Sequence, residues 1–132
     1  LTALTEQGYM PITVLGDGYL TLLRLIFTHT LAGEKAILLI EEPETSLHPG
    51  YMTLYSYLCI YAIRQLKQQI FITTHSLELI DYLLRIAEKY NLLNDIKVFH
   101  IRKEDGTNYI KEYIGREALE ELRDIGEDLR GI

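Results

Sequence analysis

A group of acidic side chains directly follows the apolar run 36–40: Glu41, Glu42 and Glu44. Carboxylates at the end of a strand can hold Mg²⁺, in part through its waters, and can orient a nucleophilic water. Pro43 stiffens the turn that carries these acids, because its ring fixes the backbone. A charged loop leaving a strand has the same composition, so these residues alone do not decide between a loop and a site.

Two further groups are made of residue types that bind phosphate. Thr73-Thr74-His75-Ser76 follows the apolar run 70–72, where a histidine could donate to a phosphate oxygen; a polar strand-to-helix turn is an equal alternative. Gly16-Asp17-Gly18 precedes a helical pattern, and both glycines and helix N-termini favour phosphate. Taken alone, this third group is better explained as a glycine-rich turn in which Asp17 caps a helix.

The segments that must position these residues alternate between helical and extended patterns. Apolar periodicity predicts helices over 18–31 and 77–87, the second of them capped by Ser76. The segment 51–67 is apolar on nearly every side and predicts a largely buried helix, and 117–129 predicts a last, charged helix. The continuous apolar run 36–40 predicts a strand covered on both faces, and 70–72 predicts a second short strand. Asp105-Gly106 predicts a hairpin between 96–101 and 109–114. This order predicts an α/β fold with a mostly parallel sheet, crossover helices and a C-terminal β-hairpin, in which ligands bind beyond the carboxyl ends of the strands.

Composition limits the kind of protein. The net charge is −6, so this segment has no basic surplus for binding nucleic acid or an anionic membrane. The longest uncharged apolar stretch, 51–63, is too short to span a membrane. The single cysteine, Cys59, cannot form an internal disulfide, which favours a reducing compartment and predicts a buried, inert thiol. We therefore expect a cytoplasmic protein.

The order of the three polar groups resembles the C-terminal half of an ATP-binding-cassette (ABC) type of P-loop ATPase. The resemblance is closest to the prokaryotic ABC-like AAA group that includes the overcoming-lysogeny-defect (OLD) and RecF/SMC-like ATPases. The segments that carry it are LGDGYLTLLRL, ILLIEEPETSLHP and IFITTHSLELID, which together cover about residues 15–81. Their joint order is specific, whereas no single segment is.

The resemblance implies roles for the acids and the histidine. Glu42 takes the position of the catalytic base that orients the attacking water, after the Walker B strand. Glu41 takes the position usually held by aspartate, which supports Mg²⁺. His75 matches the switch histidine that contacts the γ-phosphate of ATP.

The resemblance also implies contacts across a dimer of ATPase heads. Leu47-His48-Pro49 matches the D-loop region at the dimer interface. Gly16-Asp17-Gly18 matches the signature loop, which contacts the nucleotide bound to the other subunit. In this sequence Gly16 stands where serine is usual and Asp17 stands where glycine is usual, so an acid would lie near the phosphates.

The main phosphate-binding motif of such an ATPase, G-x-x-x-x-G-K-[ST], is missing from the 132 residues. We therefore expect residues 1–132 to be the C-terminal portion of one ABC-like ATPase domain, with one sheet edge left for the absent P-loop strands. A start at Leu1 agrees with a fragment. The complete homodimer would bind and hydrolyse ATP with Mg²⁺, and nucleic acid would bind only through the full-length protein. The fragment alone is expected to bind ATP weakly or not at all.

Two other functions stay open at this point. The chain could be a regulatory or interaction domain that keeps the ATPase fold without a P-loop. A metal-dependent nuclease or hydrolase ranks last, and its metal site would be built from Glu41, Glu42, Glu44, His48 and His75.

Overall fold

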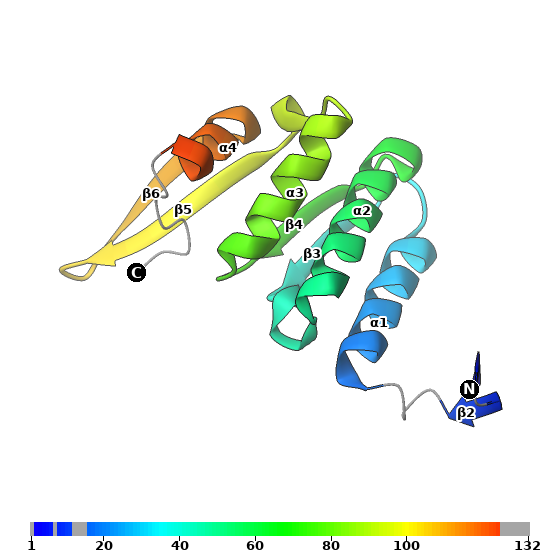
Figure 1. The fold of residues 1–132 in the computed structure, drawn as a ribbon. Coiled ribbons are helices and arrows are strands. Elements are labelled where there is room, and N and C mark those ends of the chain that lie inside the picture. Colours follow the sequence, from blue (N-terminus) through cyan, green and yellow to red (C-terminus); the bar gives the residue numbers. More distant parts are fainter. Residues whose placement is uncertain (1, 7, 12–15, 125–132) are drawn as a thin grey trace.

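A computed structural model describes residues 2–6, 8–11 and 16–124 of the chain, and Figure 1 shows their arrangement. The helices are α1 (Asp17–Ala32), α2 (Pro49–Leu66), α3 (Leu77–Lys89) and α4 (Gly115–Asp124), with the short 3₁₀ turns η2 (Pro43–Ser46) and η3 (Leu93–Asp95). The strands are β1 (Thr2–Thr5), β2 (Gly8–Pro11), β3 (Ile37–Glu41), β4 (Gln69–Thr73), β5 (Lys97–Glu104) and β6 (Thr107–Ile114).

The described strands form three separate two-stranded sheets. The β3–β4 pair is parallel, with Leu38 opposite Ile70 and Glu41 opposite Thr73. The β1–β2 and β5–β6 pairs are antiparallel. The predicted α/β fold and the C-terminal hairpin are therefore present. One mostly parallel sheet is not confirmed, because neither outer edge of β3–β4 has a strand partner among these residues.

One face of the β3–β4 pair carries the first hydrophobic core. Leu38 is buried on this face, and Ile40, Ile70 and Ile72 pack against apolar side chains of α1, α2 and the start of α3. The members of this core that are most buried on the helices are Leu22, Leu25, Met52, Tyr55, Cys59 and Leu79. The helices therefore hold the two strands in register from one side.

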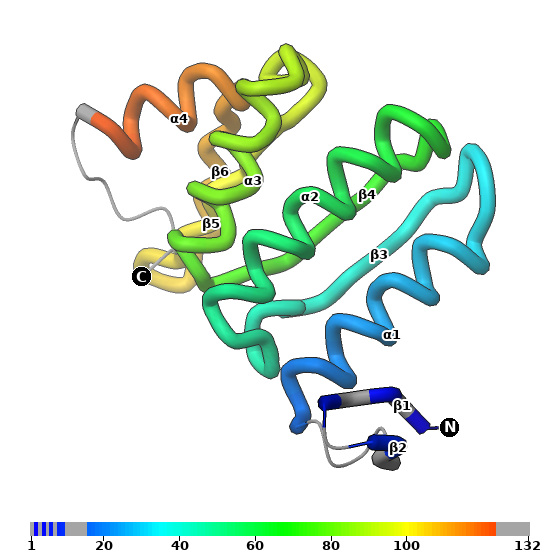
Figure 2. Tube along the Cα trace, turned by 45° about the vertical axis from the view of Figure 1, so that its right-hand side comes forward, coloured from blue at the N-terminus to red at the C-terminus, as the bar shows by residue number. Residues whose placement is uncertain are grey.

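The opposite face of the same pair is open. Ile37, Leu39 and Phe71 alternate with the buried residues and are 64%, 81% and 58% exposed. The expectation that both faces of the strand at 36–40 are covered is wrong for the described residues, since no element packs on this side of β3–β4 in either view (Figures 1 and 2). Three exposed apolar side chains on one parallel pair form a surface that an isolated domain rarely presents.

A second core joins the hairpin to the rest of the molecule. Leu84 and Ala87 of α3 pack with Tyr113 of β6 and with Ala118 and Leu119 of α4. The hairpin turn at Asp105 and Gly106 has positive φ angles of 47° and 79°, as the Asp-Gly pair predicts for a two-residue turn. The helix expected over 117–129 begins at Gly115, and its predicted part beyond Asp124 lies outside the described residues.

Helix α2 is less buried than its sequence suggests. Tyr55 and Cys59 are buried in the first core, but Leu54, Tyr57 and Tyr61 are 52%, 39% and 56% exposed on the other side of the helix. The prediction of a largely buried helix is wrong because this side of α2 has no partner in the described structure. None of the helices in the described ranges combines the length and hydrophobicity needed to cross a bilayer.

Candidate active site

The predicted site residues gather at the carboxyl ends of two neighbouring strands. β3 ends at Glu41 and β4 ends at Thr73, and these two residues are paired across the parallel strands. The loops that follow therefore leave the sheet side by side, at the edge where α/β sheets bind ligands. Figure 2 shows the N-terminal ends of α1, α2 and α3 on this same side of the molecule.

Glu42 and His75 meet at this edge. Glu42 Oε1 lies 3.3 Å from His75 Nε2, and the Glu42 backbone N–H donates to the Thr73 carbonyl at 2.9 Å. Both side chains are exposed, at 44% and 74%, so the pair itself is worth only about 0–1 kcal/mol of stability. The value of this contact is therefore geometric: it places a carboxylate and an imidazole where both can reach one ligand.

The backbone of Glu42 is held in an uncommon conformation. Its φ of 41° and ψ of 56° lie in the left-handed region, which costs a non-glycine residue roughly 1 kcal/mol. The conformation follows from two constraints: the N–H is tied to Thr73, and the carbonyl accepts from Thr45 N–H at 3.1 Å at the start of η2. Pro43, buried directly after Glu42, starts this turn.

Glu44 makes a contact that the sequence reasoning missed. Its Oε1 accepts from the backbone N–H of His75 at 2.8 Å, although the residues are 31 positions apart. Its Oε2 is buried and has no hydrogen-bond partner within the described residues. This bond holds the backbone of His75, whereas the contact with Glu42 holds its ring. In the sequence, only the pair of glutamates that flank Pro43 could have indicated a contact between Glu44 and the loop of His75.

The loop that carries His75 is fixed by short-range hydrogen bonds. Thr74 Oγ1 accepts from Ser76 N–H at 3.0 Å, and Ser76 Oγ accepts from Leu79 N–H at 3.2 Å. The predicted N-cap of α3 by Ser76 is thus confirmed. These bonds engage the side chains of Thr74 and Ser76, and the ring of His75 stays exposed.

His48 has a structural task in the described chain. It is the N-cap of α2, and its Nδ1 accepts from Gly50 N–H at 3.2 Å. Its ring lies edge-on to Tyr51 with centroids 6.4 Å apart. The imidazole keeps Nε2 for another partner, so a nucleotide or dimer contact stays a prediction.

The Gly16–Gly18 segment forms the start of α1 at the same end of the molecule. Gly16 is the N-cap with a φ of 87°, and Asp17 is the first helical residue without a side-chain cap bond. The prediction that Asp17 caps this helix is wrong, because the helix begins one residue earlier than expected: Gly16 takes the cap position, with a positive φ that glycine adopts without strain, and Asp17 is already helical. Asp17 still lies in the first turn, where a negative charge is favourable.

Gly18 brings this segment close to the loop after Glu42. A Cβ on Gly18 would lie 3.2 Å from the Ser46 carbonyl oxygen and 3.4 Å from the Tyr51 ring. The predicted signature loop and the predicted D-loop region are therefore neighbours within one chain, and Gly18 is explained by this close approach.

The described residues form no metal centre by themselves. No group of three or more His, Cys, Asp or Glu side chains in this part of the chain is arranged to hold a metal ion. The five residues of the hydrolase alternative are thus not assembled as a metal centre here. Mg²⁺ at a nucleotide needs only one or two carboxylates besides phosphate oxygens and waters, and Glu41, exposed at the end of β3, fits that smaller task.

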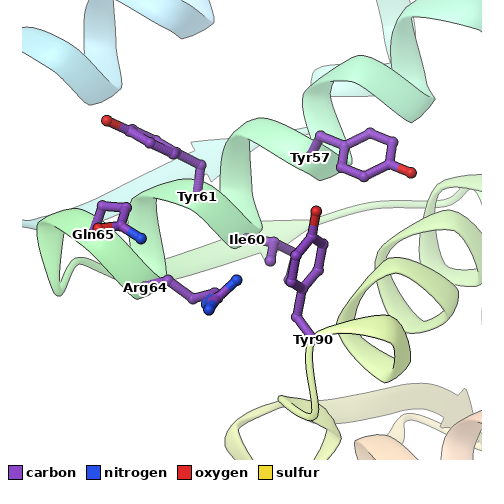
Figure 3. A pocket seen from close by; sticks show the side chains of 6 residues that line it. All are labelled: Tyr57, Ile60, Tyr61, Arg64, Gln65 and Tyr90. Atoms are coloured by element: carbon purple, nitrogen blue, oxygen red, sulfur yellow. The ribbon is translucent and has the colours of Figure 1, made fainter.

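A surface hollow lies at the other end of the helices and does not involve the site. It has a volume of about 250 Å³, and its walls come from the second half of α2 and from Tyr90 after α3 (Figure 3). The guanidinium carbon of Arg64 lies 4.9 Å from the centre of the Tyr90 ring, a cation–π contact. The hollow is accordingly a product of helix packing away from Glu42 and His75.

Comparison with known proteins identifies the family. A family profile described as "AAA domain, putative AbiEii toxin, Type IV TA system" matches residues 2–81, more than half of the chain. The chain is 34% identical to an uncharacterised protein of Methanocaldococcus jannaschii over 118 residues, which cover 89% of this chain and 100% of that protein.

A second relative is an ATP/GTP phosphatase of Helicobacter pylori, 30% identical over 125 residues. The match covers 92% of this chain but 33% of that protein, so the chain spans about a third of this relative's length. No solved structure matches. Because the family profile matches more than half of the chain, the chain belongs to this family of AAA domains.

Proposed function

We propose that this chain is the C-terminal, Walker B and switch portion of an ABC-like ATPase head of the OLD and RecF/SMC-like kind, completed by a P-loop segment. The single observation that carries the proposal is the 3.3 Å approach of Glu42 and His75 beyond two neighbouring parallel strands. Membership in an AAA domain family and similarity to an ATP/GTP phosphatase support it.

In this proposal the two side chains divide the work of hydrolysis. The Glu42 carboxylate accepts a hydrogen bond from the attacking water and aligns it with the γ-phosphate. The His75 imidazole donates to a γ-phosphate oxygen and, through its contact with Glu42, links phosphate binding to the orientation of the base. Glu41 would hold Mg²⁺ through its waters, and the ion supplies charge neutralisation at the phosphates when bound.

The exposure of both catalytic side chains argues that the site works only when covered. In water, the fields of a single carboxylate and imidazole are strongly screened, and exclusion of water strengthens them. The exposed start of α1, with Gly16 and Asp17, lies on the same side of the molecule. We propose that ATP joins two heads and that this segment of one covers the site of the other.

The open face of β3–β4 fits completion by further chain. Ile37, Leu39 and Phe71 are exposed on a parallel pair that has no strand on either outer edge among the described residues. Parallel strands are normally covered on both faces, so the P-loop segment would extend this sheet and bring a covering layer. The H. pylori relative, of which the match is a third, leaves ample length for such a segment.

A chimera tests the proposal. The matched third of the H. pylori phosphatase is replaced by this chain, and nucleotide hydrolysis and nucleotide binding are measured. We expect turnover in the chimera, and at least about a hundredfold loss with Glu42→Gln at unchanged nucleotide affinity. Glu34→Gln is the matched control, since Glu34 is an exposed glutamate before β3, away from the site.

Two results would overturn the assignment. One is a Glu42→Gln chimera that hydrolyses ATP as fast as its parent. The other comes from titration calorimetry of the 132 residues alone: micromolar binding of Mg–ATP would show that no further phosphate cradle is needed.

The M. jannaschii relative favours a second candidate, a regulatory or interaction domain without a P-loop. The match covers the whole of that relative, so a protein of about this length exists without a longer N-terminal part. Under this candidate the chain binds a partner through the β3–β4 face and Glu42→Gln has no effect on that binding, whereas Leu39→Asp weakens it.

A further inference from the structure

Glu44 ties together the two loops that carry the proposed catalytic side chains. It lies in the first turn of η2, and its Oε1 accepts from the backbone N–H of His75 at 2.8 Å. Its own carbonyl accepts from Leu47 N–H at 3.1 Å, so an internal hydrogen bond holds the turn that carries Glu44. The contact therefore joins a rigid turn to the loop after β4.

The bond to Glu44 and the contact with Glu42 act on different parts of His75. Glu44 holds the backbone, and Glu42 faces the ring. Glu44 Oε2 is buried, so this carboxylate is anchored at one oxygen while the other accepts the bond, whereas the Glu42 and His75 side chains are exposed. The Glu44 bond is short and fixes a backbone atom, whereas the 3.3 Å contact with Glu42 joins two rotatable side chains, so Glu44 restricts the position of the loop more directly.

We propose that Glu44 is a positioning residue that fixes the backbone of His75 and thereby keeps its imidazole within reach of Glu42. Its effect on catalysis rests on the proposed function, but its effect on His75 is a property of this chain alone. The Glu44 carboxylate is thus placed to fix the distance between the Glu42 carboxylate and the His75 ring before a nucleotide binds.

The positional effect is tested by NMR on the 132-residue chain. Hydrogen exchange of the His75 amide is compared in the parent chain and in Glu44→Ala, Glu44→Asp and Glu44→Gln. We expect exchange at least about tenfold faster in the alanine variant, because the N–H loses its acceptor. The aspartate variant should behave alike, since it is one methylene too short. The glutamine variant should keep the protection, because its carboxamide oxygen can accept the same bond.

Unchanged exchange in both shortened variants would overturn the proposal, as would a glutamine variant that behaves like alanine. If the alanine variant does not fold, the aspartate and glutamine variants carry the same comparison. Glu34→Ala is the control for a general loss of protection.

The catalytic effect is read in the chimera. Glu44→Ala should lower kcat at least about tenfold with little change in KM, and Glu44→Gln should restore most of it. A chimera without any turnover, combined with the expected exchange in the chain, refutes the proposed function and leaves the positional effect standing. Full turnover in Glu44→Ala overturns the catalytic part of this inference.

Discussion

The side chains of His29 and Gln68 form a buried hydrogen-bonded pair, with His29 Nδ1 2.9 Å from Gln68 Oε1. Gln68 Nε2 donates to the carbonyls of His29 and Gly33 at 2.7 Å each. Because both hydrogens of the carboxamide are used, Oε1 must accept from Nδ1–H, which places the proton of the neutral ring on Nδ1. A side chain from the turn before β4 thus closes the C-terminal end of α1, where helix carbonyls lack partners.

Replacing Gln68 by alanine should destabilise the chain strongly. The change removes three hydrogen bonds and leaves buried carbonyls without donors, so we expect the free energy of unfolding to fall by about 2–3 kcal/mol. Urea unfolding followed by circular dichroism measures it. Gln65→Ala is the matched control: this exposed glutamine, three residues earlier, should change stability by less than about 0.5 kcal/mol. Equal losses in the two variants would contradict the role of Gln68.

Stability should depend on pH through His29. Burial lowers the pKa of His29 below its ordinary 6.5, and the hydrogen bond to Gln68 offsets this in part. Between the folded and unfolded pKa values the unfolded chain binds the extra proton, so stability is fully present above about pH 6.5 and falls as the pH drops below it. The slope for one proton cannot exceed about 1.4 kcal/mol per pH unit.

Urea unfolding at a series of pH values checks this, with His29→Gln as the comparison. The variant should lose the slope just below pH 6.5. The pKa of Glu88 is lowered from its ordinary 4.5 by the hydrogen bond from Arg123, so its contribution is lost at more acidic pH and is common to both proteins. Identical slopes near pH 6 would contradict the buried neutral His29.

Two glycines in first turns of helices should respond to alanine in opposite ways. Alanine normally favours a helix over glycine by up to about 1 kcal/mol. At Gly50 the nearest atom to a new Cβ is His48 Nδ1 at 3.6 Å, an ordinary contact, so Gly50→Ala should raise the melting temperature. At Gly18 the new Cβ would lie 3.2 Å from the Ser46 carbonyl oxygen, and Gly18→Ala should lower it.

Thermal unfolding by circular dichroism measures both variants. A higher melting temperature in both variants would mean that η2 can move enough to accommodate a side chain at position 18. The opposite signs would support a tight approach of α1 to the loop after Glu42.

The single cysteine should be unreactive in the folded chain. Cys59 is 1% exposed, and burial raises its pKa to about 12 despite the Tyr55 side chain beside it, which lowers it in part. Near neutral pH the thiol is therefore protonated and shielded, and a disulfide reagent should modify it only after unfolding. Gln65→Cys in a Cys59→Ala background is the exposed control and should react at once. Rapid modification of the native parent would contradict the packing of α2.

Local signals determined most of the elements. The apolar run 36–40 predicts β3 within one residue, and 70–72 lies inside β4. A short apolar segment flanked by polar residues is typical of a buried strand, so both could be predicted locally. Ser76 and the Asp-Gly pair at 105–106 act through hydrogen bonds and backbone angles within four residues, so their cap and turn could be predicted without a tertiary structure.

The candidate site was predictable in its members and only partly in its geometry. Parallel order implies that residues after β3 and after β4 meet, which placed Glu42 near His75. The bond from His75 to Glu44 depends on the conformation of the turn η2 and on how deeply the Glu44 side chain is buried. No periodic pattern in the sequence encodes either of these. The N-cap of α1 also differed from the prediction, since Gly16 with its positive φ takes the cap position in place of Asp17.

The sequence by itself therefore determined the order of helices and strands and the end of the sheet at which the candidate site residues lie, since periodicity and capping act over a few neighbouring residues. Only the tertiary structure decided which surfaces are covered and which distant groups touch. His29 and Gln68 form a hydrogen bond although they are 39 residues apart. Leu39 and Phe71 are exposed, although their apolar segments have the composition of buried strands. Burial depends on what packs against a residue, and that is a property of the assembled chain.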